Sequence, residues 1–533
     1  MKKPGCFTMK PNDLPLFISK NRVAVYAIAA LFIFLTCIPQ SHAQKKTRIR
    51  IIEADQLQGI QSGKEELNIF TGNVIFEHDS AFLYCDSAVL FSEQNSLEAH
   101  RNVRVKISDT LNLYGDFLFY DGNTRVATMT GNVVLEDNDA TLYTERLIYE
   151  RNSAVAYYYS GGRIINEDNE LTSIKGYYDT EQKQVFFQDS VQLVNPEYLL
   201  RSDTLIYHTA TEIAFISGPT TIRGEDEFLY SEKGLYNTKT DYTRLELNSY
   251  MTYKEQYLSG DSIVYEKASG VGEAFGNVFL KDTVQGMIVT GEYADYRRKS
   301  GYAYATDSAE VIMMDKTDSL FMHADTLWLK FDSTESPEKL LAYHRCKFYK
   351  TDLQGMSDSL VYSFADSTIT MHFRPVLWTQ ENQLSAELIT VFTSNQRADS
   401  MHMTNSSFII SQDEYDTLQF NQIKGKSMVA YFEKNELHLV TVNGNSETIY
   451  FVRQEDGGLI GINKAVASSM EIWITDRQVE DIYYFDSPDA QLYPRDELPA
   501  DQYFLRDFRW RRDDRPESRF DIFQWPEDAP GLR

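Results

Sequence analysis

Cysteine and proline are scarce in this chain, and each scarcity excludes or allows a class of structure. The 533 residues include 4 cysteines and 14 prolines. So few cysteines exclude a small scaffold built on disulfides, and so few prolines allow long strands, because proline cannot donate to a strand ladder. Only Cys85 and Cys346 follow the first 43 residues. Many copies of the repeat described below separate them, which at ~4.8 Å per strand places them at least ~40 Å apart, so we expect both to be buried and unpaired.

Basic residues and helical periodicity are also lacking. Lysine and arginine number 52 against 78 acidic residues, which gives a net charge of -26. Because binding to nucleic-acid phosphates requires a clustered positive surface, this balance excludes nucleic acid as a partner. No long stretch has the period of a helix. The 34 tyrosines and 31 phenylalanines lie with β-branched residues in short runs cut by Gly, Asn and Asp, which is typical of strands and turns.

Long apolar runs are missing except near the N-terminus. Residues 23–38 form an uncharged run of 16 residues behind five basic residues, and Ser41 and Ala43 suit the -3 and -1 positions of a cleavage site. We therefore interpret residues 1–43 as a signal peptide that is cleaved before Gln44 and exports the protein. An uncleaved membrane anchor is the alternative, although a span needs roughly 20 residues.

What the chain has in abundance is a repeat. An acidic residue followed by alternating apolar positions, in the form Asp/Glu-x-Leu/Ile-x-Tyr, recurs every 27 to 33 residues between positions 55 and 387, and Gly176 fills the one place without an acid. We refer to these acids as the acidic markers. They are Asp55, Asp86, Asp116, Glu145, Asp203, Glu232, Asp261, Glu292, Asp325, Asp358 and Glu387.

A second marker lies about 13 to 15 residues before the first, in the form Gly-Asn-Val. Gly-Asn favours the positive φ angles of a tight turn, and the alternation after it, with Val103, Val105 and Ile107 on one face, is that of a half-buried strand. Each unit therefore has two strand-like halves. Copies of this marker are Gly72-Asn73-Val74, Arg101-Asn102-Val103, Gly131-Asn132-Val133 and Gly276-Asn277-Val278.

About twelve such units predict an elongated, all-β, antiparallel two-sheet repeat rather than a globule, because each unit buries its apolar face on the next. We divide the chain into the signal peptide 1–43, a first module 44–150, continued repeats 151–455, and a terminal cap with a charged tail 456–533, where prolines and charges accumulate. The tail 506–519 has six arginines and four acids, a balance of +2. Arginine suits lipid phosphates or a docking partner, but we expect a solvated segment that neutralises itself.

The order of the motifs resembles the OstA-like proteins, the β-jelly-roll modules of LptA-type lipopolysaccharide transport. Ala-Asp-x-Leu, Gly-Asn-Val-x-Phe/Leu and Leu-Tyr-x-Asp/Glu-x-Leu/Val-x-Tyr/Phe follow one another, and the segment from Glu53 to Tyr149 repeats them three times. Weaker copies extend to about residue 450. The chain departs from the family in being several times longer than the bridging member.

The resemblance implies an exported, non-enzymatic protein whose sheets form a V-shaped groove for lipid acyl chains in the periplasm, between the inner and outer membranes. It implies lipopolysaccharide or a related envelope lipid as ligand, and inner- and outer-membrane transport components as partners, bound by edge-strand pairing. A structural or adhesive β-solenoid at the cell surface is the alternative interpretation, and for each groove residue ordinary core packing is the alternative. We expect the groove to be lined by Val74, Phe76, Val103, Val105, Leu118, Tyr120, Val133 and Leu135.

The acidic markers raise the question of a metal or a catalytic centre. Stacked carboxylates can bind Ca²⁺, but such sites need oxygens that converge in one loop, and the glycine-rich nonapeptide pattern is absent. We instead expect the carboxylates to accept hydrogen bonds from backbone N–H groups at turns. No nucleotide-binding loop, nucleophile elbow or zinc-protease motif occurs. We predict no catalytic residue, metal or cofactor; the scattered acids of a polysaccharide-cleaving solenoid are the alternative.

Overall fold

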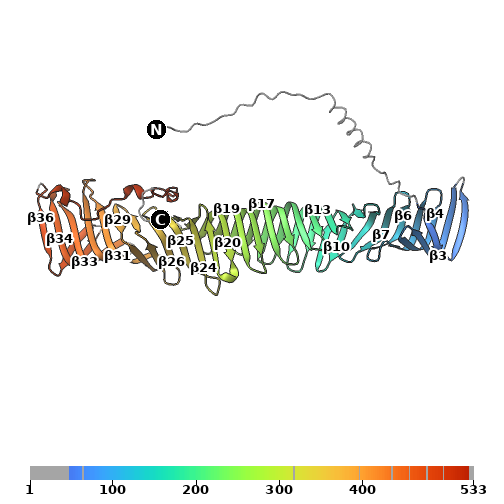
Figure 1. Cartoon of the computed structure of the whole chain (residues 1–533), viewed down its shortest axis with the longest axis horizontal. Coiled ribbons are helices and arrows are strands. Elements are labelled where there is room, and N and C mark those ends of the chain that lie inside the picture. The colour runs from blue at the N-terminus through green and yellow to red at the C-terminus, as the bar shows by residue number, and fades with distance from the viewer. Residues whose placement is uncertain are drawn as a thin grey trace, which may run out of the picture.

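The structure, a computed structural model, describes residues 47–62, 65–315, 318–394, 397–433, 436–454, 456–475, 478–495 and 497–526. The expected signal peptide and its cleavage site lie outside these residues. Within the described ranges, no helix has both the length and the apolar character needed to cross a membrane. Strands and short turns make up most of the described residues, which form one long, narrow body (Figure 1). The elongated all-β fold expected from the repeat is confirmed.

The strands follow one another as an antiparallel meander joined mainly by short hairpins. The first twelve are β1 (Arg50–Glu53), β2 (Gln56–Ser62), β3 (Glu65–His78), β4 (Ala81–Phe91), β5 (Ser96–Lys106), β6 (Asn112–Asp121), β7 (Val126–Glu136), β8 (Thr141–Glu150), β9 (Val155–Tyr158), β10 (Gly162–Asn166), β11 (Asn169–Ser173) and β12 (Lys175–Asp179). The middle twelve are β13 (Gln184–Val194), β14 (Leu199–His208), β15 (Ile213–Arg223), β16 (Glu227–Asn237), β17 (Tyr242–Tyr253), β18 (Gln256–Glu266), β19 (Val271–Asp282), β20 (Met287–Arg297), β21 (Tyr302–Thr306), β22 (Glu310–Met313), β23 (Leu320–His323) and β24 (Thr326–Phe331).

The last twelve strands carry the same architecture past residue 456. They are β25 (Pro337–Lys350), β26 (Leu353–Ser363), β27 (Thr368–His372), β28 (Val376–Thr379), β29 (Asn382–Ser385), β30 (Leu388–Ser394), β31 (Arg397–Gln412), β32 (Phe420–Glu433), β33 (Glu436–Arg453), β34 (Leu459–Thr475), β35 (Gln478–Phe485) and β36 (Asp489–Tyr493). Short 3-10 turns are η1 (Arg298–Ser300), η2 (Ala500–Gln502), η3 (Arg512–Asp514) and η4 (Asp521–Phe523). The domain limits at 150 and 456 stay predictions. Buried apolar side chains form one cluster within residues 49–278 and a second within 287–472.

A kink divides most long strands into two halves. In β3, pairing with β4 shifts register between Thr71 and Val74, and the two residues between them, Gly72 and Asn73, have φ angles of 74° and 45°. Positive φ was predicted for this marker and is confirmed, but the marker is a bulge within a strand and not a turn between strands. A bulge bends its strand. Further left-handed pairs at kinks are Arg101-Asn102, Gly131-Asn132, Asp189-Ser190, Leu247-Asn248, Gly276-Asn277, Asn405-Ser406 and Gly444-Asn445.

The acidic markers lie beside these kinks on the preceding strand. The side-chain amide of Asn132 donates to Asp116 at 2.8 Å, and the backbone N–H of Asp55 donates to the carbonyl of Gly72 at 2.9 Å. We expected the acidic markers to accept hydrogen bonds from backbone N–H groups at turns. This is wrong for most of the markers with a described contact, because their main donor is the asparagine side chain of the neighbouring kink. The same amide-carboxylate bond joins Asn73 to Asp55, Asn102 to Asp86, Asn248 to Glu232 and Asn277 to Asp261.

The kinks fold the meander into two facing layers. Layer A contains the half-strands in which Leu97 pairs with Tyr120 and Leu118 with Met129. Layer B contains those in which Phe76 pairs with Leu83 and Val105 with Leu113. The apolar side chains of both layers meet between them in one buried cluster. We call the kinked edge of this V the apex, and the two rows of hairpins at its open edge the rims.

The two cysteines after the signal region are buried and unpaired, as expected. Cys85 belongs to the cluster of the N-terminal half and Cys346 to that of the C-terminal half. Burial raises the pKa of the Cys85 thiol to about 12, so this group is protonated and packs as a small apolar side chain.

The C-terminal segment 494–526, which we call the strap, doubles back from β36 over the outer face of layer B (Figure 1). Leu505 is buried against Phe408 and Ile410, whereas Ile409 between them packs into the interior. Alternate residues of a strand face opposite sides, so the strap covers the outside of the V. At its far end, η4 contacts β23 and β25.

Buried glutamines of layer B bind the backbone of the strap. The amide of Gln422 donates to the carbonyl of Tyr503 at 2.8 Å and accepts from the N–H of Leu505 at 2.8 Å. Gln383 makes the same pair of bonds, both at 2.7 Å, six residues further along the strap. The two glutamines lie two strands apart in the sheet. An advance of six residues along the strap therefore corresponds to an advance of two strands across layer B.

The expectation of a solvated tail is wrong. Arg515 donates to Gln354, two strands further on, at 2.7 Å, and Arg511 pairs with Asp514 at 2.6 Å within the strap. Arginines and acids of the strap therefore do neutralise each other, as expected, but the strap is docked on layer B and is not a solvated segment. The strap docks because its backbone groups find partners on the sheet and its apolar side chains cover an apolar outer face.

The first prediction concerns the kink. Asn132→Ala removes the hydrogen bond to Asp116 and places alanine at a φ of 46°, which should cost about 1–3 kcal/mol locally. The measurement is hydrogen exchange of the β6, β7 and β8 amides, because long repeats need not unfold in one step. Asn132→Gly keeps the left-handed conformation and should lose only the hydrogen-bond part. Equal exchange in both variants and the wild type would show that the bond does not hold the kink.

The second prediction concerns the strap. Replacing Gln383 and Gln422 by leucine removes four hydrogen bonds to the strap backbone, so trypsin should cleave the arginine-rich strap at least about tenfold faster while the strands stay protected. Gln182→Leu, in an exposed layer-A hairpin, is the matched control. Unchanged cleavage of the strap would mean that its apolar contacts suffice.

Candidate functional site

The residues predicted to line a groove point into the space between the layers. Six of the eight are fully buried, with at most 1% of each residue exposed, and Val105 and Tyr120 are partly buried against the same cluster. The fully buried members are Val74, Phe76, Val103, Leu118, Val133 and Leu135. Leu118 and Tyr120 belong to layer A and the other six to layer B. The structure brings all eight into one interior, and their role in lipid binding stays a prediction.

A narrow apolar cavity opens between the rims in the N-terminal half. Phe76, Val105, Leu118 and Tyr120 are among the side chains that line it. Val74, Val103 and Val133 follow the kinks directly and lie toward the apex. The cavity volume is about 40 Å³, which is room for a few waters at most and far below the size of a lipid site. At this place the interior is therefore filled largely by its own side chains in this conformation.

Residues 47–49 cross the mouth of this cavity and contact both rims. The hydroxyl of Thr47 donates to Asp79 at 2.6 Å on the layer-B rim. The N–H of Ile49 donates to Asn95 at 3.0 Å, and Asn95 donates to the carbonyl of Thr47 at 3.1 Å, on the layer-A rim. The side chain of Ile49 lines the cavity and is buried. The segment is thus a cover held by exchangeable polar bonds.

Charged groups join the rims at the same mouth. Arg125 and Arg151, from layer-A hairpins, lie 2.9 and 3.5 Å from Asp79 on the layer-B rim. Arg151 also donates to the carbonyl of His78 at 2.9 Å and to Ser80 at 2.9 Å. Burial opposes the charge on Asp79, but the Thr47 hydrogen bond and the nearby cations together hold its pKa below the usual value.

His78 lies directly beneath these charges. Its Nδ1 is 2.7 Å from the Tyr120 hydroxyl and its Nε2 is 2.9 Å from the Thr47 hydroxyl. Burial lowers the pKa of His78 from its ordinary 6.5, with the backbone of Thr47 and the charge of Asp79 opposing this shift. The neutral imidazole therefore links layer B, layer A and the covering segment.

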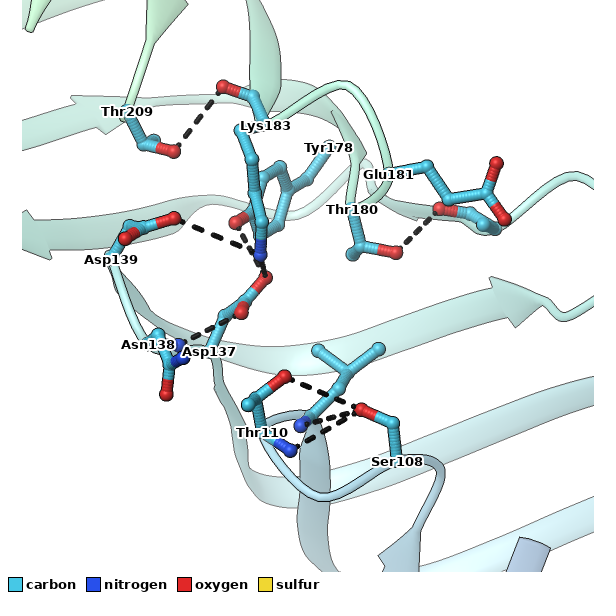
Figure 2. Close-up of polar contacts among 12 residues, drawn as sticks. Ser108, Thr110, Asp137, Asn138, Asp139, Tyr178, Thr180, Glu181, Lys183 and Thr209 are labelled. Carbon is cyan, nitrogen blue, oxygen red and sulfur yellow. Dashed lines mark hydrogen bonds and ion pairs between the residues drawn. The ribbon is translucent and has the colours of Figure 1, made fainter. Parts of the chain in front are cut away.

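A second bridge closes the rims further along (Figure 2). Lys183 and Tyr178 of layer A converge on the carboxylate of Asp137 in a layer-B hairpin, at 2.5 and 2.9 Å. Burial, followed by the charge of Asp137, raises the pKa of Tyr178, so its hydroxyl remains a donor. The carboxylate of Asp137 is almost fully enclosed, and its charge is compensated by the lysine.

Further bridges follow the same edge. The buried hydroxyl of Tyr207 in layer A donates to Asn166 of layer B at 2.8 Å, and burial raises the pKa of Tyr207 to about 12. Lys267 reaches Glu197 across the rims at 3.2 Å. These rim residues were missed from the sequence. One feature of the sequence could have indicated them. Charged residues and tyrosines occur at the ends of these hairpins, where a turn by itself requires only small polar residues.

The acidic markers lie at the apex, away from this mouth. Where the structure describes the chain, no three His, Cys, Asp or Glu side chains are placed to hold a metal ion together. The markers are spaced one unit apart and several bind the asparagine of a kink, as described above.

Comparison with known proteins bears on residues 46–203, which match the model of the OstA-like protein family. No curated protein matches the chain. A solved structure with partial similarity is LptH, described as the LptA homologous periplasmic component of the conserved lipopolysaccharide transport device from Pseudomonas aeruginosa. It shares 15% identity over 19% of this chain and 76% of that chain, with a TM-score of 0.18. Residues 46–203, which contain the closed cavity and its charged mouth, are thus OstA-like, and the resemblance drawn from the sequence is confirmed for that segment.

Proposed function

We propose that this chain is a non-enzymatic carrier of envelope lipid, with lipopolysaccharide as its principal ligand, that shields acyl chains between its two layers as they pass through the periplasm from the inner to the outer membrane. The observation that carries this proposal is the apolar interior between the layers, formed by two buried clusters with Ala294 packed against both, whose open edge is closed by exchangeable polar bridges. The OstA-like match of residues 46–203 supports it.

Burial alone supplies the binding energy of such a carrier. Each CH₂ group transferred from water into an apolar interior contributes roughly 0.8 kcal/mol. The N-terminal cavity, at about 40 Å³, is too small for an acyl chain, so the rims must part before a chain enters there. Parting the rims exposes Asp79 and Asp137 with their cations to water. Hydration of the separated charges then offsets the attraction that is lost, because these groups are largely desolvated in the closed state.

The ends of the body suit partners of the same architecture. At the N-terminal end, β1 and β2 pair with β3, one in each layer, and with no other strand among the described residues, and Ile52 and Leu57 are exposed there. At the C-terminal end, β35 and β36 each pair with β34 and, within the same described ranges, with no further strand. Unpaired strand edges are templates for addition of another strand. We propose that inner- and outer-membrane transport components bind these ends by edge-strand pairing.

A structural or adhesive β-solenoid at the cell surface is the second candidate, favoured by the filled interior and by the strap that covers the C-terminal half. Labelling of intact cells with a membrane-impermeant reagent separates the two, because a periplasmic carrier is protected and a surface protein is labelled.

The third prediction tests the carrier directly. A photoreactive residue at Val105 or Leu118, which face the interior, should crosslink to lipopolysaccharide in cells, whereas the same residue at Arg104 or Phe119 should not. These neighbours face outward, and Phe119 is 41% exposed against 1% for Leu118, so each pair differs by one position in the strand. Crosslinks of equal yield at inward and outward positions would contradict transport through the interior.

The fourth prediction concerns pH at the mouth. Since the pKa of His78 is lowered in the folded state, the folded state disfavours the proton that the unfolded state binds below pH 6.5. Closure is therefore fully stable above pH 6.5 and weakens as pH falls from 6.5 toward the lowered value. The protection of the N–H of Ile49 and of the β3 amides, measured as the exchange rate relative to the intrinsic rate at the same pH, should fall in that window. Asp79, whose own pKa is lowered from 3.8, stays charged there and does not contribute.

His78→Asn should make this protection insensitive to pH between about 5 and 7, the range in which an ordinary histidine titrates. His402→Gln, at an exposed site on the outer face, is the control and should leave the pH response intact. A response of unchanged size without His78 would contradict the assignment of the pH dependence to this histidine.

A further inference from the structure

The mouth of the N-terminal cavity is amphipathic. Its walls are apolar, with Phe76, Leu97 and Leu118 among them, yet the guanidinium-bearing side chains of Arg125 and Arg151 also line it. Both arginine side chains are less than one-fifth exposed. Two cations are therefore held at the entrance of an apolar space, in a chain whose net charge is -26.

The charges at the mouth do not cancel. Arg125 and Arg151 share a single carboxylate, that of Asp79, and His78 is kept neutral by burial, so two positive charges and one negative charge leave +1. Arg125 also donates to the carbonyl-type oxygen of Asn152 at 3.2 Å, and a guanidinium carries five N–H donors. An anion with several acceptor oxygens could thus bind both arginines at once in place of the shared carboxylate.

Resting on the proposed function, we infer that Arg125 and Arg151 recognise the phosphate headgroup of the transported lipid while its acyl chain displaces Ile49 from the cavity. Arginine binds phosphate bidentately and is favoured for it over lysine. The headgroup lies at the rim, where it stays hydrated, and the chain lies between the layers. The site selects anionic, phosphate-bearing amphiphiles over neutral ones, and residues 47–49 occupy it until lipid arrives.

The covering segment fits this arrangement. Thr47 donates to Asp79, the same carboxylate that holds the two arginines, and Ile49 fills the apolar end of the site. The cover therefore combines a polar contact to Asp79, beside the arginines, with an apolar side chain in the cavity, and these are the two places that the head and the chain of a phosphate-bearing amphiphile would occupy. Binding of one excludes binding of the other.

The fifth prediction tests this selectivity with the full chain. Dodecyl phosphate and dodecyl maltoside carry the same chain with an anionic or a neutral head, and calorimetry below their micelle concentrations gives their affinities. Replacing Arg125 and Arg151 by glutamine should weaken dodecyl phosphate at least about tenfold and leave dodecyl maltoside within about twofold. Replacement by lysine should restore part of the phosphate affinity, because charge returns without the guanidinium fork.

Arg104→Gln with Arg163→Gln is the matched control. These two arginines lie on the outer face of layer B over tyrosine rings, so the affinity for dodecyl phosphate should be unchanged in this variant. Ile49→Asp should strengthen the binding of both amphiphiles, because the covering segment then loses the apolar side chain that fills the cavity and that the acyl chain has to displace.

The outcomes separate the inference from the function on which it rests. If the glutamine variant loses affinity for both amphiphiles equally, the arginines only hold the rims together. If it loses affinity for neither, the arginines do not recognise the head. Both results overturn the inference and leave the proposed carrier function intact. Inorganic phosphate that displaces dodecyl phosphate at equal concentration would overturn the lipid assignment in favour of a simple anion site. Failure of the wild type to bind either amphiphile, together with absent crosslinks at Val105, would contradict the carrier itself.

Discussion

The kink in the middle of the strands is the constraint on which the rest of the structure depends. A meander of straight strands would form one wide sheet with two exposed faces, and its apolar residues could not all be buried. Two left-handed residues bend the strand, and the bond from asparagine to the acidic marker of the neighbouring strand keeps successive kinks in line, as at Asn132 and Asp116. The polar bonds at the apex thus create the apolar interior.

The two long edges of the V differ in what it takes to open them. At the apex, a continuous backbone and the aligned kinks join the layers. At the rims, contacts of side chains join them, such as Lys183 to Asp137 and Tyr207 to Asn166. Water can replace a rim hydrogen bond at a small net cost, whereas it cannot replace apolar contacts in the interior. Opening by the rims, with the apex as the hinge line, is therefore the least costly deformation of the fold.

Much of this architecture could be predicted from the sequence, because it depends on local patterns that recur. The alternation of Val103 and Val105 and the positive φ of Gly-Asn are local properties, and both hold in the structure. The same Gly-Asn signal suits a tight turn and a bulge, so the kink was taken for a turn. The hydrogen bond between Asn132 and Asp116 could not be predicted, because it depends on the register between neighbouring strands.

The strap and the rim bridges could not be predicted, since their partners are far apart in sequence. Gln383 binds the strap 126 residues away, and a lone glutamine in a strand has no pattern that names such a partner. One signal was available: Phe408, Ile409 and Ile410 are consecutive and apolar, which means that both faces of that strand are buried. Another part of the chain was therefore needed to cover the outer face of this strand. The C-terminal tail is the part that does so.

The strap also makes the two halves of the body mechanically unequal. In the C-terminal half, layer B is covered on its inner face by layer A and on its outer face by the strap, so bending it disrupts two sets of apolar contacts. In the N-terminal half, the outer face of layer B carries solvated groups such as Arg104 and Tyr143, and bending it disrupts one set. For a carrier that must part its rims to admit an acyl chain, the compliant half is the one that contains the charged mouth. The stiff C-terminal half then keeps its two layers, and the interior between them, in a fixed arrangement up to the C-terminal end of the body.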